Sequence, residues 1–203
     1  MIDFIQLGAN VGDQPEDILW RLIPLKNWKG IFVEPVPSSF EKLKENYAHL
    51  EGCFFENVAV MDYEGEVTLY LNDKFDNETA TAFGPKAMRA GRRPIEVPCV
   101  TLDSLIDKYN LRGVKFHILQ IDIESAEDKV LLSTSFRDIL PRYIRFEDVH
   151  LSQPVQKKIA QHLARYGYNP CVDLYKDFNP AERGRYDVMY ERESGVVLVA
   201  EGI

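Results

Sequence analysis

Short apolar runs alternate with amphipathic segments along most of the chain. Each run is four to eight residues long, and several end in a glycine or an acidic residue. Near-continuous apolar runs of this length are typical of strands buried on both faces of a parallel sheet. The alternation predicts an α/β fold whose sheet carries helices on both faces. The expected sheet strands are 3–7, 30–34, 53–60, 117–122 and 143–147.

Helical segments are expected between these strands. Apolar residues recur at helical spacing over 15–25 and predict the first helix there. Ser38 followed by Glu41 has the spacing of a capping box, so the second helix is expected over 38–50. Further helices are expected over 102–110, over 126–132, and from Ser152 onwards.

The remaining segments are less regular. Residues 67–71 and 95–100 have β character, and 168–174 and 186–200 are expected to complete the sheet, partly as an antiparallel hairpin. The polar segment 72–94 contains Gly, Pro and Arg, and long irregular loops of this kind often lie over active sites. We find no repeat or linker, so we expect one domain over residues 1–203.

Composition narrows the classes of partner. Apolar residues make up 45% of the 203 residues, which is ordinary for a globular protein. The net charge of −8 opposes binding to DNA or RNA, which requires a basic surface. The one basic cluster, 86–93, is either a contact for an anionic substrate or a solvated loop. We therefore expect a small-molecule or carbohydrate substrate.

The expected compartment is the cytoplasm. No apolar run is long enough to cross a membrane, and no signal peptide is visible. Cys53, Cys99 and Cys171 are far apart and odd in number, which favours reduced thiols over a disulfide framework. The sequence leaves a monomer and a homo-oligomer both open.

A glycine turn directly follows the first strand. Gly8, Ala9 and Gly12 are small, so the backbone can approach a ligand closely. Glu34 ends the next strand, where a carboxylate can accept hydrogen bonds from both hydroxyls of a ribose. Together these two features predict a site for a nucleotide-type cofactor.

The glycine spacing discriminates between cofactors. Asn10 and Asp13 occupy the second and third glycine positions of a dinucleotide-binding turn, which disfavours NAD and FAD. The chain also lacks the phosphate-binding loop of ATP-binding proteins. S-adenosylmethionine carries an adenosine and an amino acid but no phosphate. It is the cofactor that this looser turn favours.

Acidic residues end two further strands. Asp122 and Glu147 lie about 5 Å apart laterally if their strands are neighbours, and Asp148 adds a third carboxylate. Carboxylates that are so close must share a cation or take up a proton. One interpretation is that Asp122, Glu147 and Asp148 are ligands of Mg²⁺. Alternatively, one of these carboxylates or His150 acts as a general base, or the acids only cap helices.

Several segments, in their order along the chain, resemble the FkbM family of S-adenosylmethionine-dependent methyltransferases. Together they extend over residues 3–170. They are 8–12, 33–37 with Phe40, Leu43 and Asn46, 57–60 with Gly65, 97–103, 121–127 and Glu147. The resemblance implies a class I methyltransferase fold, which is Rossmann-like and has a seven-stranded sheet that ends in an antiparallel strand. It also implies O-methylation of a sugar, a glycolipid or another natural product.

The resemblance further implies roles for individual residues. Gly8, Ala9, Asn10 and Gly12 line the methionine end of the cofactor, and Glu34 holds the ribose. Pro35, Asn57, Val58 and Ala59 lie by the adenine, while Asp122 and Glu124 face the transfer site. Glu147 and Asp148, with Asp122, resemble the acidic metal site of Mg²⁺-dependent sugar O-methyltransferases.

Three residues depart from the family pattern. Gln6 stands where the family usually has Asp near the cofactor's amino group, Gln120 replaces a usual Lys, and Ser125 replaces a usual Gly. Gln6 and Ser125 keep open a non-catalytic module that binds S-adenosylmethionine or another protein. A nucleotide-dependent oxidoreductase is a further alternative, which Asn10 disfavours.

Overall fold

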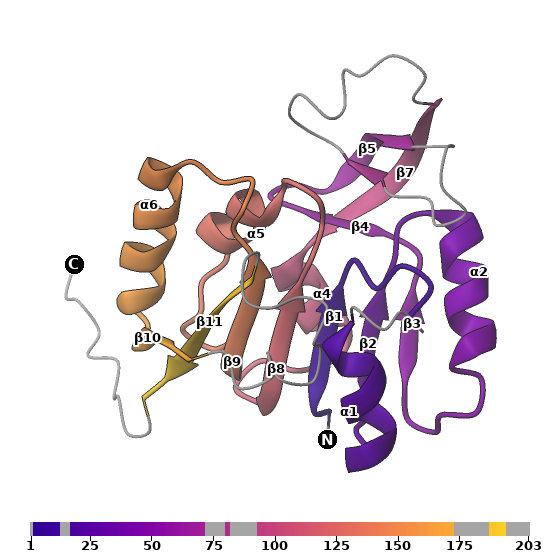
Figure 1. The fold of residues 1–203 in the computed structure, drawn as a ribbon, viewed down its shortest axis with the longest axis horizontal. Coiled ribbons are helices and arrows are strands. Elements are labelled where there is room, and N and C mark those ends of the chain that lie inside the picture. Colours follow the sequence, from indigo (N-terminus) through magenta and orange to yellow (C-terminus); the bar gives the residue numbers. More distant parts are fainter. Residues whose placement is uncertain (1, 13–16, 72–79, 82–92, 173–186, 194–203) are drawn as a thin grey trace.

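Seven strands form the main sheet of the computed structural model, which describes residues 2–12, 17–71, 80–81, 93–172 and 187–193. The strands are β1 (Phe4–Leu7), β2 (Gly30–Val33), β3 (Phe54–Glu56), β8 (Lys115–Ile121), β9 (Leu140–Glu147), β10 (Tyr168–Cys171) and β11 (Asp187–Arg192). Their order across the sheet is β10-β11-β9-β8-β1-β2-β3 (Figure 1). Only β11 is antiparallel to its neighbours. The expected α/β class with a mostly parallel seven-stranded sheet is confirmed.

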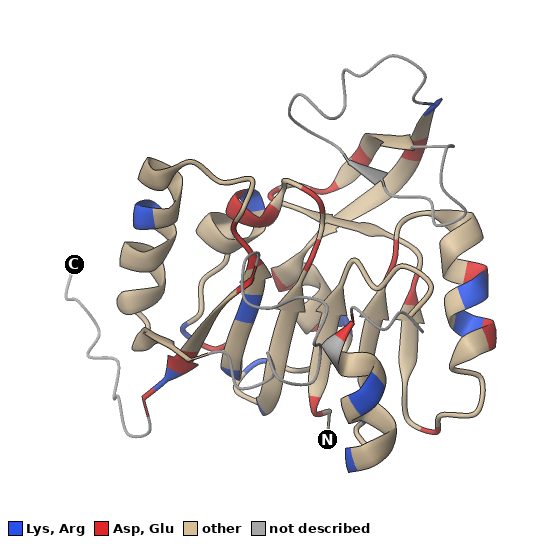
Figure 2. Cartoon of the chain, viewed as in Figure 1, with Lys and Arg blue, Asp and Glu red and all other residues tan. Residues whose placement is uncertain are grey.

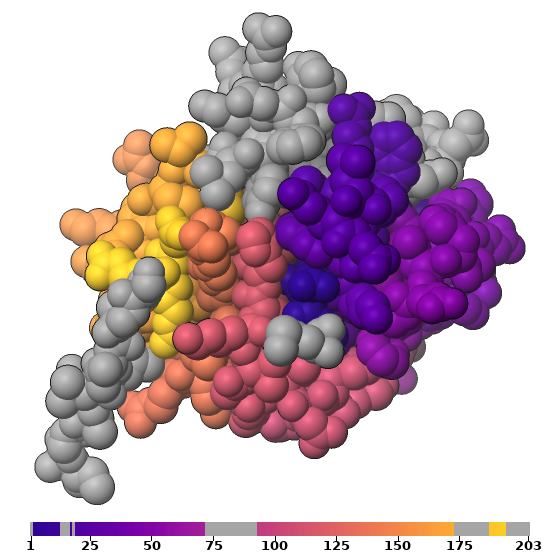
Figure 3. Space-filling view, turned by 90° about the horizontal axis from the view of Figure 1, so that it is seen from below, coloured from indigo at the N-terminus to yellow at the C-terminus, as the bar shows by residue number. Residues whose placement is uncertain are grey.

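Helices cover both faces of this sheet. They are α1 (Ile18–Lys26), α2 (Pro37–Asn46), α4 (Leu102–Lys108), α5 (Glu127–Ser133) and α6 (Gln153–Ala164). Alternate residues of a strand point to opposite faces. Phe4 and Phe32 pack with α1 and α2, whereas Ile5 and Leu119 pack with α4, α5 and α6. Figure 3, seen from below, shows the violet α1 region and the rose α4 region on opposite sides of the sheet.

Local residues explain where the first two helices begin. The Asp17 carboxylate accepts a hydrogen bond from the Leu19 amide and caps α1. α2 begins at Pro37, and its N-cap residue Val36 makes no side-chain cap bond, so the capping box expected at Ser38 is wrong. Proline suits the first turn because its missing N–H would have no partner there.

A second, four-stranded sheet adjoins the main one in Figure 1. It contains β4 (Ala59–Met61), β7 (Arg93–Thr101), β5 (Gly65–Leu71) and β6 (Ala80–Thr81), in that order. The β character expected at 67–71 and 95–100 is confirmed, because these residues lie in the antiparallel pair β5–β7. None of the described helices is long and apolar enough to cross a membrane.

Two expectations about this region are wrong. The strand expected at 53–60 is two short strands in different sheets, because Asn57 donates to the carbonyls of Glu34 and Pro35 and the chain then turns to pair with β7. Part of the loop expected at 72–94 is strand, namely β6 and the start of β7. The rest of that loop, including most of the basic cluster 86–93, lies outside the described residues.

The core on the α1–α2 face is organised around Phe32. Its ring is fully buried and stacks on Tyr47 and Phe55, with ring centroids 4.7 and 5.3 Å away. Phe4 meets it edge-on at 4.9 Å. Aromatic pairs in these geometries add to the stabilisation from burial itself. Phe32 thereby joins β1, β2, β3 and the end of α2, directly beneath the predicted cofactor loop.

Replacing Phe32 should therefore destabilise the whole fold. We expect F32A to lower the free energy of unfolding by about 3–5 kcal/mol, because it leaves a cavity between three strands and a helix. F54A is the matched control, since Phe54 is 46% exposed on the next strand and should cost about 1 kcal/mol. Urea unfolding curves measure both values. Equal losses of unfolding free energy in F32A and F54A would show that the buried Phe32 ring stabilises the fold no more than the exposed Phe54 ring does.

Candidate functional site

Two glycines make the loop after β1 possible. Gly8 has φ +78°, and a Cβ there would lie 1.8 Å from the Asp122 carbonyl oxygen. Gly12 has φ +79°, and a Cβ there would collide with the side chains of Tyr47 and Leu43. Any larger residue at either position would push the loop off the strand or helix beside it. The predicted glycine turn is thus packed tightly against both β8 and α2.

Hydrogen bonds from β2 and α2 hold this loop in place. The amides of Gly8 and Ala9 both donate to the Val33 carbonyl, at 2.9 and 3.0 Å. Asn46 Nδ2 donates to the Val11 carbonyl at 2.8 Å, and the Tyr47 hydroxyl donates to the Gly12 carbonyl. The loop is therefore fixed before any ligand binds.

Glu34 is buried beneath the same loop. Its Oε2 accepts the Asn10 amide at 2.8 Å, and its Oε1 accepts the Val36 amide at the same distance. Burial raises the pKa of Glu34 to about 7, although both hydrogen bonds oppose that shift. A carboxylate has about four acceptor positions, so a ligand that donates hydrogen bonds can still use the remaining ones. Glu34 thus connects the glycine loop to the start of α2.

The residues expected beside an adenine continue from Glu34. Asn57 holds the backbone of Glu34 and Pro35 through the two hydrogen bonds described above. Val58 packs against the main core, and Ala59 is buried in the core of the second sheet. The structure therefore brings Pro35 and Asn57 together, while the Ala59 side chain faces other residues of the protein.

A second buried glutamate holds the loop after β8. Glu127 is 1% exposed, and its two oxygens accept the amides of Ile123 and Ser125 at 3.0 and 3.1 Å. Burial raises its pKa to about 7. Glu124 and Ser125 have φ values of +54° and +86°, which glycine adopts more easily. The sequence pattern does not predict this role, because an acid in the first helical turn usually signals only helix capping.

Acidic side chains gather where β8 and β9 end. Figure 2 shows this concentration of red at the ends of both strands and in the loops that follow. Potential ligand atoms of Asp122, Glu127 and Glu147 lie within 4.8 Å of one another, as do those of Glu124, Glu147 and His150. The structure therefore places Glu147 near both Asp122 and His150, all three of which the sequence predicted as functional, and adds Glu127.

Asp122 is the acid that the surroundings affect most. Its side chain is exposed, yet its pKa lies well above the ordinary value. Desolvation is the main cause, followed by the charges of Glu147, Asp187 and Glu124. A carboxyl group can be exposed and still poorly solvated when water reaches it from one side only. Asp122 can consequently hold a proton under conditions in which an ordinary aspartate is fully ionised.

His150 and Asp148 differ in how they relate to this cluster. His150 Nε2 lies 3.4 Å from Glu147 Oε2, so the ring can exchange a proton with a carboxylate of the cluster. Asp148 is partly buried, which raises its pKa, but it belongs to neither group of converging acids. The three residues predicted as magnesium ligands are thus only partly brought together.

A row of three buried polar side chains crosses the α1 face of the sheet, close to the carboxyl ends of its strands. Gln6, Gln120 and Arg145 occupy matching positions on β1, β8 and β9, and each is about 5% exposed. Arg145 Nη1 donates to Gln120 Oε1 at 3.2 Å, and its Nη2 lies 2.7 Å from Asp187 Oδ2. The sequence does not reveal this row, because its members are far apart along the chain.

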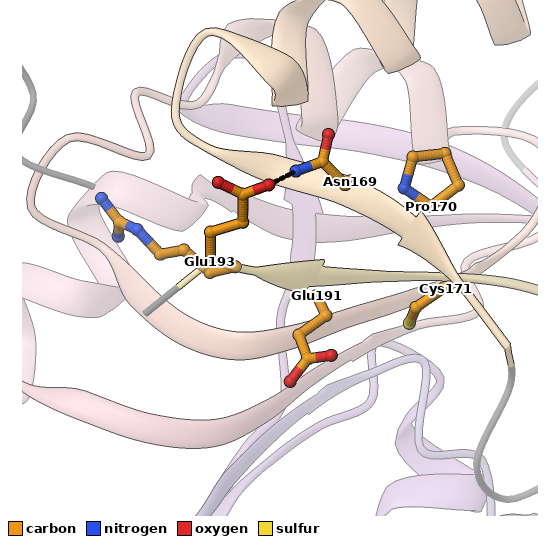
Figure 4. Close-up of a pocket in the computed structure, with 6 residues that line it drawn as sticks. Asn169, Pro170, Cys171, Glu191 and Glu193 are labelled. Atoms are coloured by element: carbon orange, nitrogen blue, oxygen red, sulfur yellow. Dashed lines mark hydrogen bonds between the residues drawn. The ribbon is translucent and has the colours of Figure 1, made fainter. Parts of the chain in front are cut away.

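A shallow cavity of about 440 Å³ lies far from this edge. Its walls come from β10 and β11, and Asn169 donates to Glu193 at 2.7 Å beside it (Figure 4). Figure 4 shows Glu191 and Cys171 on the other side of β11. None of the residues predicted for the cofactor or the transfer site lines this cavity, so it is separate from the candidate site.

Comparison with known proteins identifies one sequence family. The family model described as "Methyltransferase FkbM domain" matches residues 6–170. No curated protein matches the chain significantly. Two similar solved structures are ribosomal protein L11 methylase from Lactobacillus delbrueckii subsp. bulgaricus (12% identity, TM-score 0.46, 95% of this chain and 70% of that one) and Aeropyrum pernix fibrillarin with bound S-adenosyl-L-methionine (11% identity, TM-score 0.47, 93% and 66%).

The raised pKa of Glu127 predicts how stability depends on pH. An unfolded glutamate ionises near its model value of 4.5, whereas buried Glu127 keeps its proton until about pH 7. Its contribution to stability is therefore complete below pH 4.5 and is lost as the pH rises through 7, by at most about 3 kcal/mol. Because glutamine does not ionise, E127Q should flatten the decrease in unfolding free energy between pH 5 and 8.

Denaturant unfolding at several pH values tests this expectation. D128N is the matched control, since Asp128 is the next residue of α5 but accepts neither of the two loop amides. It should retain the wild-type pH dependence. A parallel loss of stability at every pH in E127Q would contradict the assigned shift.

Proposed function

The chain belongs to the FkbM methyltransferase family, and we propose that it methylates a hydroxyl group of a sugar, a glycolipid or another natural product. It is an S-adenosylmethionine-dependent methyltransferase with a class I fold. The observation that supports O-methylation is the exposed Asp122 carboxyl group, whose pKa is raised among four other acids. A hydroxyl group is a poor nucleophile near neutral pH, so its methylation benefits from a nearby proton acceptor.

The residues of the first loop suit S-adenosylmethionine. In the described part of the chain, Gln6 Oε1 and Asn10 Oδ1 are buried acceptors with no hydrogen-bond partner. Such atoms are costly unless a ligand or water donates to them. The Glu34 carboxylate offers acceptor positions for ribose hydroxyls, and the Asn57 amide fixes the adjacent backbone. Gly8, Ala9 and Gly12 leave the loop free of side chains that would block the ligand.

The acidic residues where β8 and β9 end are proposed to act on the substrate hydroxyl that receives the methyl group. S-adenosylmethionine supplies an electrophilic methyl group, so the protein must mainly position a hydroxyl oxygen and accept its proton. Asp122 is the proposed proton acceptor. Glu147 and His150, which lie within 3.4 Å of each other, can pass that proton to solvent. A potential ligand atom of Glu124 lies within 4.8 Å of those of Glu147 and His150.

Magnesium provides a second proposed use of the same acids. Mg²⁺ prefers oxygen ligands and keeps bound waters or substrate hydroxyls, and a bound hydroxyl would lose its proton more easily. Asp122 and Glu147 have the required chemistry, and a potential ligand atom of Glu127 lies within 4.8 Å of theirs. A non-catalytic role is the remaining alternative, in which the ligand binds but no methyl group is transferred.

Glu34 offers the first test of the cofactor site. We expect E34A to weaken the binding of S-adenosylhomocysteine by about 100-fold or more, because two ribose hydrogen bonds and the loop anchor are lost together. E56Q is the matched control, since Glu56 ends the neighbouring strand but binds Lys108 and Tyr109. Calorimetric titration gives both affinities. An unchanged affinity in E34A would remove Glu34 from the site.

Asp122 offers the test of O-methylation. Transfer of a labelled methyl group to a panel of neutral sugars and hydroxylated natural products should identify an acceptor. D122N should then lower kcat by about 10²- to 10⁴-fold, because the proton acceptor is lost. D138N is the matched control, since Asp138 pairs with Arg112 away from this edge and should leave kcat unchanged.

Added chelator separates the two proposed mechanisms. Loss of turnover with EDTA and recovery with Mg²⁺ would assign the acids to a metal, whereas insensitivity would assign Asp122 to direct proton transfer. Methyl groups found only on nitrogen, or full activity in D122N, would contradict the proposal. Ligand binding without any turnover would support the non-catalytic alternative.

A further inference from the structure

We propose that Gln6 and Asp17 together form the receptor for the amino group of the cofactor. In this arrangement the Gln6 carbonyl oxygen accepts a hydrogen bond from the ammonium group. The Asp17 carboxylate, hydrogen-bonded behind it, supplies the negative charge. The inference rests on S-adenosylmethionine being the cofactor, and it assigns a role to Asp17, which neither the sequence pattern nor the family match provides.

The first support is the unusual state of Gln6. The residue is 4% exposed in the middle of β1, and its side chain points to the α1 face of the sheet, as Phe4 does. Its Nε2 donates to Asp17 Oδ2 at 2.6 Å, but its Oε1 is buried and accepts no hydrogen bond from any described group. A buried acceptor without a donor usually indicates a partner that is absent, such as a ligand.

A second acceptor in the same state lies in the adjacent loop. Asn10 Oδ1 is also buried without a hydrogen-bond partner among the described residues. The Asn10 backbone is held with φ +47° by the bond from its amide to Glu34. An ammonium group has three N–H donors and no acceptor, so it suits buried oxygen atoms that lack a donor.

Asp17 supplies the charge that Gln6 lacks. Burial raises the pKa of Asp17 to about 6, although Gln6, the Leu19 amide and the charge of Arg145 all act against that shift. The Asp17 carboxylate is therefore mostly ionised at pH 7, and these three groups offset only part of the cost of burying its charge. The Arg145 guanidinium already forms an ion pair with Asp187 and donates a hydrogen bond to Gln120. An additional cation beside Gln6 would complete the charge balance.

The alternative is that Asp17 only caps α1 and that Gln6 only ties this helix to β1. Both roles are visible in the structure, and neither uses Gln6 Oε1. A purely structural pair would affect every ligand of the loop equally. A receptor for the amino group would affect only those ligands that carry one.

Two ligands distinguish these roles. S-adenosylhomocysteine carries the amino group, and its desamino analogue differs only in lacking it. We expect wild-type protein to bind the first at least about tenfold more tightly, as suits a hydrogen bond to a charged group. D17N should remove this preference while changing the affinity for the desamino analogue by less than about twofold. Asparagine keeps an oxygen for the Leu19 amide, so α1 should stay capped.

Exchanging the two side chains tests the pair more sharply. Q6E combined with D17N again provides one carboxylate and one amide, in exchanged order, and should restore the preference for the amino group. D3N is the matched control, since Asp3 accepts the Lys29 amide at the opposite end of β1 and should leave the preference unchanged. Calorimetric titration supplies all affinities, and thermal unfolding checks that each variant is folded.

The outcomes separate this inference from the proposed cofactor itself. An unchanged preference in D17N, or an equal loss for both ligands, would overturn the role of Asp17. Failure of the double variant to recover any preference would overturn the division of roles between the two residues. If wild-type protein bound neither ligand, the proposed cofactor site would fail before this question arose.

Discussion

The close approach of Gly8 to the Asp122 carbonyl is the constraint on which the whole candidate site depends. A hydrogen atom in place of a Cβ lets the loop after β1 begin directly against the end of β8, where the Asp122 amide donates to the Leu7 carbonyl at 3.0 Å. The cofactor loop and the acidic loop are consequently neighbours, although Gly8 and Asp122 are 114 positions apart in the sequence. Methyl transfer requires this proximity, because the donor and the acceptor must meet within van der Waals distance.

The same physical solution fixes the loops on both sides of that contact. Glu34 holds the first loop and Glu127 holds the second, each by accepting two backbone amides while buried. Both loops contain non-glycine residues at positive φ, a conformation that costs about 1–3 kcal/mol when poorly favoured. Burying the carboxylates adds a further cost, which their pKa values near 7 express. Strain and buried charge are therefore concentrated where ligands are expected to bind rather than in the core.

The sequence predicts the parts of this structure that depend on local pattern. Apolar runs identify the strands of the main sheet, and Gly8 with Glu34 identifies the cofactor edge, because spacing along the chain decides both. It fails at 53–60, where Asn57 bonds to a segment more than 20 residues away and redirects the strand. The row of Gln6, Gln120 and Arg145 could not be predicted, since it depends on the register between strands. The bonds of Glu127 to the amides of Ile123 and Ser125 are local, but an acid in the first helical turn usually signals only helix capping. The sequence does predict that Asp122 and Glu147 lie close together, because both end a strand at the same edge of the sheet.

The charge pattern of the edge also has a consequence for the proposed chemistry. S-adenosylmethionine carries a positive sulfonium, and a cation near Asp122 lowers the pKa of that carboxyl group. When bound, S-adenosylmethionine would supply the methyl group, and its positive charge would pass to the acceptor oxygen, from which Asp122 would take the proton. Desolvation and the charges of Glu147, Asp187 and Glu124 raise the pKa of Asp122. On the proposed mechanism, the charge of the cofactor would favour ionised Asp122 before methyl transfer, and the surrounding acids would favour its protonation afterwards.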